Sequence, residues 1–264
     1  MSEDMTALLD NYAIYLPALD WHYCEYVVGG SDPFVPSGVR QADLNFLNSS
    51  SKLWTYEWCL ASAGCLAYSD KTNAITQRDP KSSWILGDSG GYQVATGALR
   101  DTNGWAAFSR EPDVIASLWR ESNVKARVLN WLDAHCDYAM TLDMPLWVKL
   151  PKFAGSPFHH CSTELLTELT VENLRYISDR RGVVGKSKFL NVIQGNDEEE
   201  EQYWYEKVRD FDFEGWAIGS KVNWRGALVP MLKRLLLMRD ERMLEGGKQG
   251  STSLGSLNLP GLSP

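Results

Sequence analysis

Short β-prone runs alternate with longer helical patterns from about residue 83 onward, and this alternation limits the possible folds more than any other feature of the chain. The β-prone runs cover residues 84–86, 138–142, 189–193 and 216–218. Successive strands separated by a helix run parallel and are joined by right-handed crossovers. The alternation therefore predicts an α/β fold built on a parallel sheet or barrel.

The helical patterns fall between and after these runs. They cover residues 114–136, 162–181, about 197–209, and about 225–244. The first eighty residues are harder to interpret, although a helix near residues 53–66 and two further strands are expected there. The whole chain has the length of one (β/α)8 barrel domain, since 264 residues lie within the usual range for this fold.

A polar residue or a glycine follows each expected strand. These residues are Asp88, Asp143, Gln194 and Gly219. In parallel barrels, the loops after the strands meet at one rim, which carries the active site. We therefore expect these four residues to surround one concavity.

Composition excludes several classes of protein. The chain has 26 Lys and Arg against 34 Asp and Glu, a net charge of −8, which excludes a uniformly basic nucleic-acid-binding surface but not a local basic patch. No apolar run approaches the roughly 20 residues of a membrane span. The start, Met1 to Asp4, is unlike a secretory signal, and the five cysteines form no C-x-x-C pair. We expect a cytoplasmic protein without membrane partners.

Three familiar chemistries fit poorly. The run Gly87 to Gly91 reads GDSGG, as around the nucleophile of chymotrypsin-like proteases, but His135 follows Ser89 instead of preceding it. The cluster His159, His160 and Cys161 lacks the paired spacing of zinc ligands. No G-x-G-x-x-G or Walker loop is present. The sequence thus predicts no metal and no cofactor.

The residues at the strand ends suit a flat heterocycle instead. Two carboxylates can accept hydrogen bonds from ring N–H and amine groups, while a glutamine and a backbone N–H donate to a ring carbonyl. Tyr92 adds an aromatic ring beside Asp88. Together these groups describe a pocket for a guanine-like base.

Four motifs of the chain resemble, in order, those of the tRNA-guanine transglycosylase superfamily, whose members exchange guanine for a 7-deazaguanine in tRNA or DNA. The resemblance covers roughly residues 80–245. The motifs are DSGGYQ at 88–93, YAMTLD at 138–143, VIQG at 192–195 and GWAIG at 215–219.

The resemblance implies a TIM-type (β/α)8 barrel and a role for each matching residue. Asp88 would recognise the base and handle protons, Asp143 would recognise the base, and Tyr92 would stack on it. Gln194 and the Gly219 N–H would donate to the base carbonyl. The remaining base-binding residues implied by the motifs are Ser89, Gly90, Gly91 and Gly195.

The chain also departs from the family pattern. Ser220 and Lys221 replace the usual glycine and leucine, which weakly favours a DNA substrate over tRNA. The family's nucleophilic aspartate on the eighth strand and its zinc cluster have no counterpart here. Codons for residues 250–255, read one nucleotide back, can encode Ile-His-Phe-Leu-Gly, which resembles a seventh strand. A frameshifted or shortened gene is therefore one hypothesis.

The expected organisation is one partial barrel domain over residues 1–247, with about six of eight strands, and a disordered tail over residues 248–264. Such a remnant would expose strand edges, so we expect it to be marginally stable and to associate, with a partner subunit or with itself, through residues 216–219. Without the nucleophile it would have no exchange activity alone.

A basic rim is expected around the pocket. Lys149 and Lys152 follow Asp143, and Lys221 and Arg225 follow Gly219. These cations would contact the phosphates of DNA or tRNA. Two functions stay open: a guanine transglycosylase, and a non-catalytic homologue or subunit that binds a nucleobase or nucleic acid.

Overall fold

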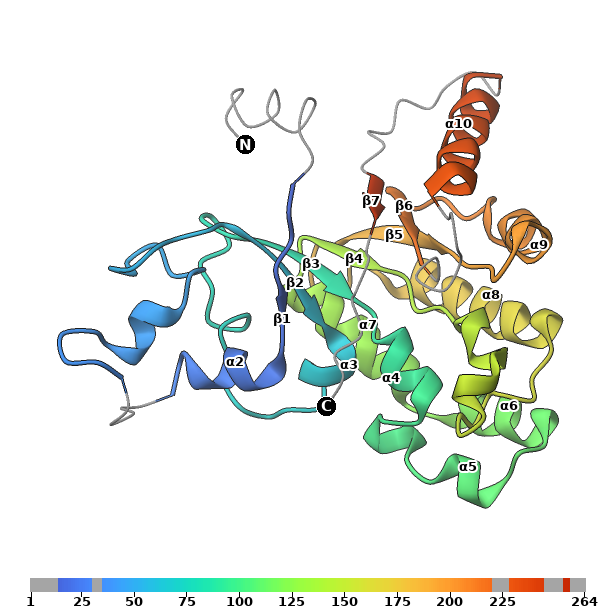
Figure 1. Ribbon diagram of the computed structural model, residues 1–264, viewed down its shortest axis with the longest axis horizontal. Coiled ribbons are helices and arrows are strands. Elements are labelled where there is room, and N and C mark those ends of the chain that lie inside the picture. The colour runs from blue at the N-terminus through green and yellow to red at the C-terminus, as the bar shows by residue number, and fades with distance from the viewer. Residues whose placement is uncertain (1–13, 30–34, 220–227, 245–253, 257–264) are drawn as a thin grey trace.

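The computed structural model describes residues 14–29, 35–219, 228–244 and 254–256 and shows one parallel sheet flanked by helices (Figure 1). The seven strands lie side by side in their sequence order, each parallel to its neighbours. They are β1 (Ala18–Leu19), β2 (Trp58–Ser62), β3 (Trp84–Asp88), β4 (Tyr138–Met140), β5 (Lys188–Ile193), β6 (Gly215–Ile218) and β7 (Leu254–Ser256). The expected α/β class is confirmed.

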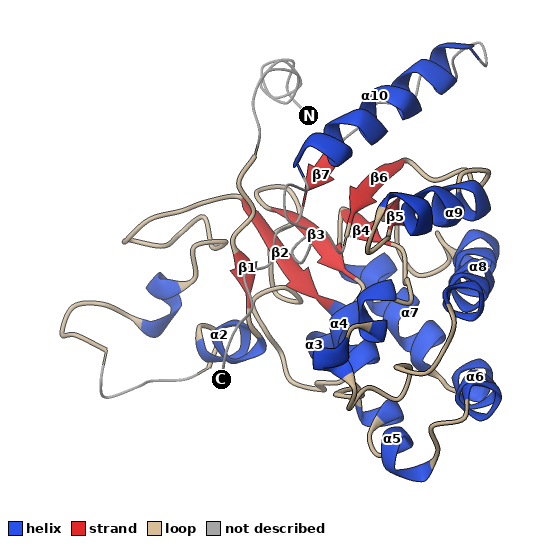
Figure 2. Cartoon of the chain, turned by 45° about the vertical axis from the view of Figure 1, so that its right-hand side comes forward, coloured by secondary structure: helices blue, strands red, loops and turns tan. Residues whose placement is uncertain are grey.

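The helices that follow the strands form a layer on one side of the sheet (Figure 2). A sequential strand order with right-handed crossovers requires this arrangement, whereas a doubly wound sheet places helices on both sides. The helices are α2 (Trp21–Tyr26), α3 (Ala63–Leu66), α4 (Gly91–Thr96), α5 (Trp105–Phe108), α6 (Pro112–Glu121), α7 (Val124–His135), α8 (Thr163–Arg180), α9 (Glu198–Val208) and α10 (Leu228–Leu244). Short 3-10 helices cover Gln41–Leu44, Arg100–Thr102, Leu146–Lys149 and Pro151–Phe153.

Alternation along the strands produces two separate apolar clusters. Ile85, Ala139 and Phe189 point toward the helices and belong to the main core. Side chains at the alternate positions of the strands point to the other face of the sheet. They form a second cluster: Leu60, Leu86, Met140, Leu190, Val192 and Ala217. Both faces of the sheet are therefore apolar, which is usual for parallel strands and unusual for a sheet with one face in water.

Three expectations need correction. The helix expected at residues 53–66 is mostly β2, because the run Trp58–Ser62 is buried on both sides of the sheet and only Ala63–Leu66 is helical. The described residues form seven strands and not the expected six, since Leu254–Ser256 in the expected disordered tail pairs with β6. That pairing also covers the edge of β6 through which we expected the chain to associate.

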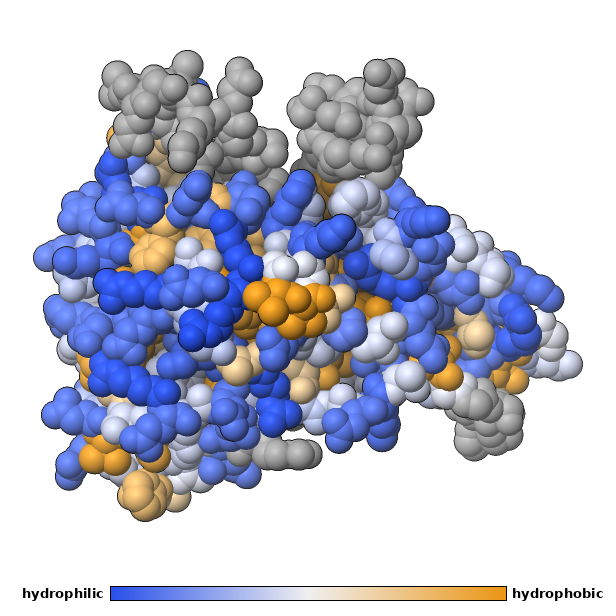
Figure 3. All heavy atoms as spheres, turned by 180° about the vertical axis from the view of Figure 1, so that it is seen from behind, coloured by the Kyte–Doolittle hydropathy of each residue, from blue (hydrophilic) through white to orange (hydrophobic). Residues whose placement is uncertain are grey.

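Hydrophilic side chains cover most of the face seen in Figure 3, as the charged composition leads one to expect. Among the described residues, no helix is long and apolar enough to cross a membrane.

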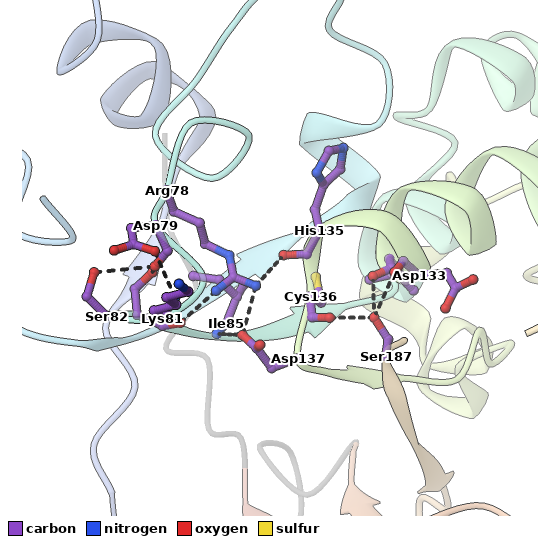
Figure 4. Close-up of polar contacts among 12 residues, drawn as sticks. Arg78, Asp79, Lys81, Ser82, Ile85, Asp133, His135, Cys136, Asp137 and Ser187 are labelled. Atoms are coloured by element: carbon purple, nitrogen blue, oxygen red, sulfur yellow. Dashed lines mark hydrogen bonds and ion pairs between the residues drawn. The ribbon is translucent and has the colours of Figure 1, made fainter. Parts of the chain in front are cut away.

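A buried ion pair joins the amino ends of β3 and β4, opposite the ends that carry the expected site (Figure 4). Arg78 contacts Asp137 at 2.9 Å and donates to the Ser83 and His135 carbonyls. The Asp137 carboxylate also accepts from the Ile85 N–H at 2.8 Å. These bonds fix where the two strands begin.

Replacing Arg78 by methionine should destabilise the fold by about 3 kcal/mol, because it leaves Asp137 partly buried without its cation and two carbonyls without a donor. Urea unfolding followed by far-UV circular dichroism measures this change. Exchange of the exposed Lys81 for methionine is the control and should change the free energy of unfolding by less than about 0.5 kcal/mol. Equal midpoints for the two variants would contradict the assigned role.

Candidate functional site

The turn after β3 brings the first motif against the turn after β2. Gly90 has a φ of 84°, a conformation that favours glycine. A Cβ on Gly90 would lie 2.5 Å from Cα of Gly64, so the two backbones touch only because both residues are glycine. Gln93 secures the same contact by donating from Nε2 to Sγ of Cys65 at 3.4 Å. Sequence reasoning missed Gly64 because no motif marks a contact between distant turns.

The substitution Gly90→Ala should cost more than about 2 kcal/mol, since it adds a left-handed alanine to a backbone clash. Thermal unfolding of Gly90→Ala and of Gly104→Ala separates the cost of a left-handed alanine from the cost of the backbone clash. Gly104 also has a φ of 84°, but a Cβ there would meet nothing within 4 Å. A loss of stability no larger than that of Gly104→Ala would show that the contact with Gly64 is unimportant.

Asp143 and Gln194 form a buried pair at the ends of β4 and β5. Gln194 Nε2 donates to Asp143 Oδ2 at 2.5 Å. The two residues are 5% and 4% exposed. Burial, followed by the charge of Asp88, raises the pKa of Asp143 to about 7, although the hydrogen bond from Gln194 opposes the shift. The Asp143 carboxyl therefore exchanges its proton near neutral pH.

Asp88 lies close enough to raise the pKa of Asp143, and burial raises the pKa of Asp88 itself. In the register of the sheet, Asp88 lies opposite Ser62 of β2. Gly91, three residues after Asp88, lies against the Asp143 carboxyl group, because a Cβ added to it would lie 3.4 Å from Asp143 Oδ1. The structure thus brings Asp88, Gly91, Asp143 and Gln194 together at the carboxyl ends of three adjacent strands.

The side-chain carbonyl of Gln194 is buried and, among the described residues, has no hydrogen-bond partner. A buried polar atom without a partner costs about 1–3 kcal/mol and is uncommon in folded proteins. A bound molecule that donates a hydrogen bond to Oε1 would remove this cost. The pair thus offers an acceptor, a carboxyl group and the second N–H of Nε2.

Tyr92 lies at the start of α4 and is 56% exposed. Its ring centre lies 5.7 Å from that of the buried Trp147, and Trp147 in turn lies 4.3 Å from Phe153. An exposed aromatic ring supported by two others presents a face on which a flat molecule can stack. Ser89, next to Asp88, is buried.

Two glycines have packing roles. The Gly219 N–H donates to the Ile193 carbonyl at 2.9 Å as part of the sheet, so the expectation that it donates to a base is wrong. Gly219 instead makes room for Gln194, because a Cβ would lie 2.6 Å from Nε2. A Cβ on Gly195 would lie 2.7 Å from Cα of Glu201, so this glycine lets β5 approach α9.

Lys149, one of the four cations expected at the rim, is bound within the protein. Lys149 binds Oε1 of Glu200 at 2.5 Å and also contacts Thr163, so its charge is engaged within the protein. Glu200 accepts further bonds from Thr163 and Asn196. Burial alone would raise the pKa of Glu200, but the bonds from Lys149 and Thr163 lower it overall. This cluster fixes the loop after β4 to α8 and α9.

The other three cations expected at the rim are Lys152, Lys221 and Arg225. Lys152 is exposed, with its ammonium 5.0 Å from the centre of the Phe153 ring. Lys221 and Arg225 lie outside the described residues. The described part of the chain therefore places one of the four expected cations, Lys152, at the surface near the aromatic group.

The alternative chemistries find no geometric support. Ser89 follows the carboxyl end of β3, whereas His135 precedes β4 at the opposite end of the sheet. His159 Nδ1 lies 2.8 Å from the Val148 carbonyl. Among residues 14–29, 35–219, 228–244 and 254–256, no group of three or more His, Cys, Asp or Glu could hold a metal ion.

Two surface cavities lie away from these residues. The larger, about 610 Å³, is lined by residues from 22 to 29 and from 70 to 72. The second, about 310 Å³, lies between Phe46, Tyr56 and Ser82. Neither cavity is lined by Asp88, Asp143 or Gln194. The candidate site is therefore defined by its buried polar groups and not by one of these cavities.

Neither the known protein-family models nor the curated proteins match this chain.

Proposed function

We propose that the chain binds a guanine-like base at the carboxyl ends of β3, β4 and β5, and that it belongs to the lineage of enzymes that exchange guanine for a 7-deazaguanine in DNA or tRNA. The observation that carries this proposal is the buried pair of Asp143 and Gln194, with an unpaired amide carbonyl and a carboxyl group whose pKa is about 7. The sequential parallel strands support a TIM-type barrel as its frame.

The pair matches the edge of guanine group by group. Gln194 Oε1 accepts from the ring N–H, the second N–H of Gln194 donates to the ring carbonyl, and an ionised Asp143 accepts from the exocyclic amine. Tyr92 covers one face of the ring. Asp88 provides a second carboxyl group beside the base, in position to take or return a proton as the base leaves.

Exchange itself requires a nucleophile. In the family's chemistry, an aspartate oxygen bonds to C1′ of the sugar while the glycosidic bond breaks and guanine leaves with a proton. N9 of the incoming base then displaces the carboxylate, loses its own proton, and restores the original sugar configuration. Asp88 and Asp143 hold the base in this proposal, and Glu200 is bound to Lys149.

A second candidate function follows from the question of which carboxylate could act as the nucleophile. Within the described residues, no further carboxylate at the strand ends is left to attack the sugar. This observation favours a non-catalytic homologue, or a subunit that binds a base or nucleic acid while another chain supplies the nucleophile.

Incubation with radiolabelled guanine and either tRNA or duplex DNA, alongside calorimetric titration with guanine, separates these functions. Label in the nucleic acid supports the transglycosylase, and the nucleic acid labelled identifies the substrate. Binding of guanine without incorporation supports the non-catalytic candidate. Absence of both binding and incorporation would remove both proposals.

A further inference from the structure

Ser62, at the end of β2, is a polar residue of the candidate site that no sequence motif marks. It is the register partner of Asp88 at the end of β3. Two residues earlier on the same strands, Leu60 and Leu86 are also partners, and both belong to the second apolar cluster. Because side chains two residues apart on a strand point to the same face, Ser62 and Asp88 lie side by side at the carboxyl edge of that face.

The Ser62 hydroxyl is not used in the way that is usual for a serine at its position. Ser62 is the N-cap of α3, where a serine side chain normally accepts a hydrogen bond from an N–H of the first helical turn, but here it makes no capping bond. Its Oγ is buried and, within the described part of the chain, has no partner at hydrogen-bonding distance. Buried hydroxyls are almost always hydrogen-bonded in folded proteins, so this one is expected to serve a group beside it.

The group beside it is the Asp88 carboxyl. Burial raises the pKa of Asp88, and the Ser62 hydroxyl and the Gly90 N–H are near enough to oppose this shift. The two donors belong to the turns after β2 and β3, which the contact of Gly64 with Gly90 holds together. A donor favours the ionised form of a carboxyl group, so both turns stabilise the charge on Asp88.

Two further titratable groups face Asp88. They are the carboxyl group of Asp143, after β4, and the thiol of Cys65 in α3. In each, burial raises the pKa most and the charge of Asp88 raises it further. Cys65 therefore stays protonated at neutral pH. Since Asp143 holds its proton up to about pH 7 beside a charged Asp88, Asp88 is the carboxyl group that ionises first.

We propose that Ser62 is a positioning residue for Asp88: its hydroxyl donates to the Asp88 carboxylate, fixes it beside the base and keeps it ionised while Asp143 changes its protonation state. The proton that the incoming base loses from N9 then passes to an oxygen of Asp88, and Ser62 keeps its own proton. The inference rests on the proposed function in this respect, because that function supplies the proton that Asp88 takes.

Carbon-13 NMR titration of the aspartate carboxyl groups in the full chain measures the pKa of Asp88, whose signal is identified by its loss in Asp88→Asn. Ser62→Ala should raise this pKa by about one pH unit, because it removes a donor to the ionised form. Ser62→Thr keeps the hydroxyl and should restore a value near that of the wild type. A serine that only supported the fold would change the unfolding temperature and leave the titration of Asp88 unchanged.

The matched control is Ser178→Ala, at an exposed serine of α8, which should leave the pKa of Asp88 unchanged. Circular dichroism establishes that each variant is folded. An unchanged pKa of Asp88 in a folded Ser62→Ala protein, or an equal rise in Ser62→Thr, would overturn the inference. Calorimetric titration of the wild type with guanine separates this result from a failure of the proposed function. A shifted Asp88 titration without guanine binding supports the role of Ser62 toward Asp88 and removes the base site.

Discussion

Replacing Asp143 by alanine is expected to weaken binding of guanine by at least about 100-fold. The change removes the charged acceptor of the exocyclic amine and leaves that donor unpaired in a buried site, a loss of about 3 kcal/mol. It also deprives Gln194 of the partner that fixes its amide. Isothermal titration calorimetry with free guanine measures the effect directly.

The matched control for this experiment is Asp179→Ala, at an exposed aspartate on α8. The control should bind guanine as the wild type does. Circular dichroism spectra of both variants establish that each is folded. A folded Asp143→Ala protein with unchanged affinity would eliminate Asp143 as a base-binding residue.

Asp143→Asn should make the protein more stable at pH 8 and change its stability little at pH 4. In the folded protein the pKa of Asp143 is about 7, raised from 3.8 by burial and then by the charge of Asp88. The stability associated with the proton on Asp143 is fully present below pH 4 and is lost as the pH rises toward and through 7. The loss is about 4 kcal/mol, because the pKa differs by about 3 between the unfolded and the folded protein.

The measurement is the difference in free energy of unfolding between the wild type and Asp143→Asn from pH 4 to pH 8. This difference cancels the carboxyl groups whose pKa values are lowered, such as Glu200, because they are present in both proteins. Burial also raises the pKa of Asp88, and this cause is present in both proteins, so the difference removes it as well. A pH-independent difference would show that Asp143 is ionised without cost in the folded protein.

Much of the fold could be predicted from periodicity. Strands β3 to β6 and helices α8 and α9 agree with the sequence predictions to within about two residues, because each is a short apolar run or an amphipathic segment with a clear cap. The N-cap of α9 is Asp197, whose side chain accepts from the Glu200 N–H. The sequence favours a helix at β2 because Trp58–Ser62 is buried on both faces of the sheet and so lacks the alternation of a half-buried strand.

The juxtaposition of Asp88, Asp143 and Gln194 followed from topology alone, since parallel strands bring their carboxyl ends to one edge. Which polar groups are engaged in hydrogen bonds within the protein could not be predicted. Whether the Gly219 N–H is free depends on the register between β5 and β6, and whether Lys149 faces solvent depends on Glu200, 51 residues away. The contact of Gly64 with Gly90 likewise depends on backbone approach, which has no sequence signal at Gly64 itself.

The most direct test of the account is a crystal structure of the chain with bound guanine. We expect the hydrogen-bonding edge of the base to lie between Asp143 and Gln194, with Asp88 beside it and Tyr92 over its face. Guanine bound only in the cavity beside Glu25 and Lys71, or no bound guanine at concentrations that saturate binding in solution, would contradict the assignment of the site.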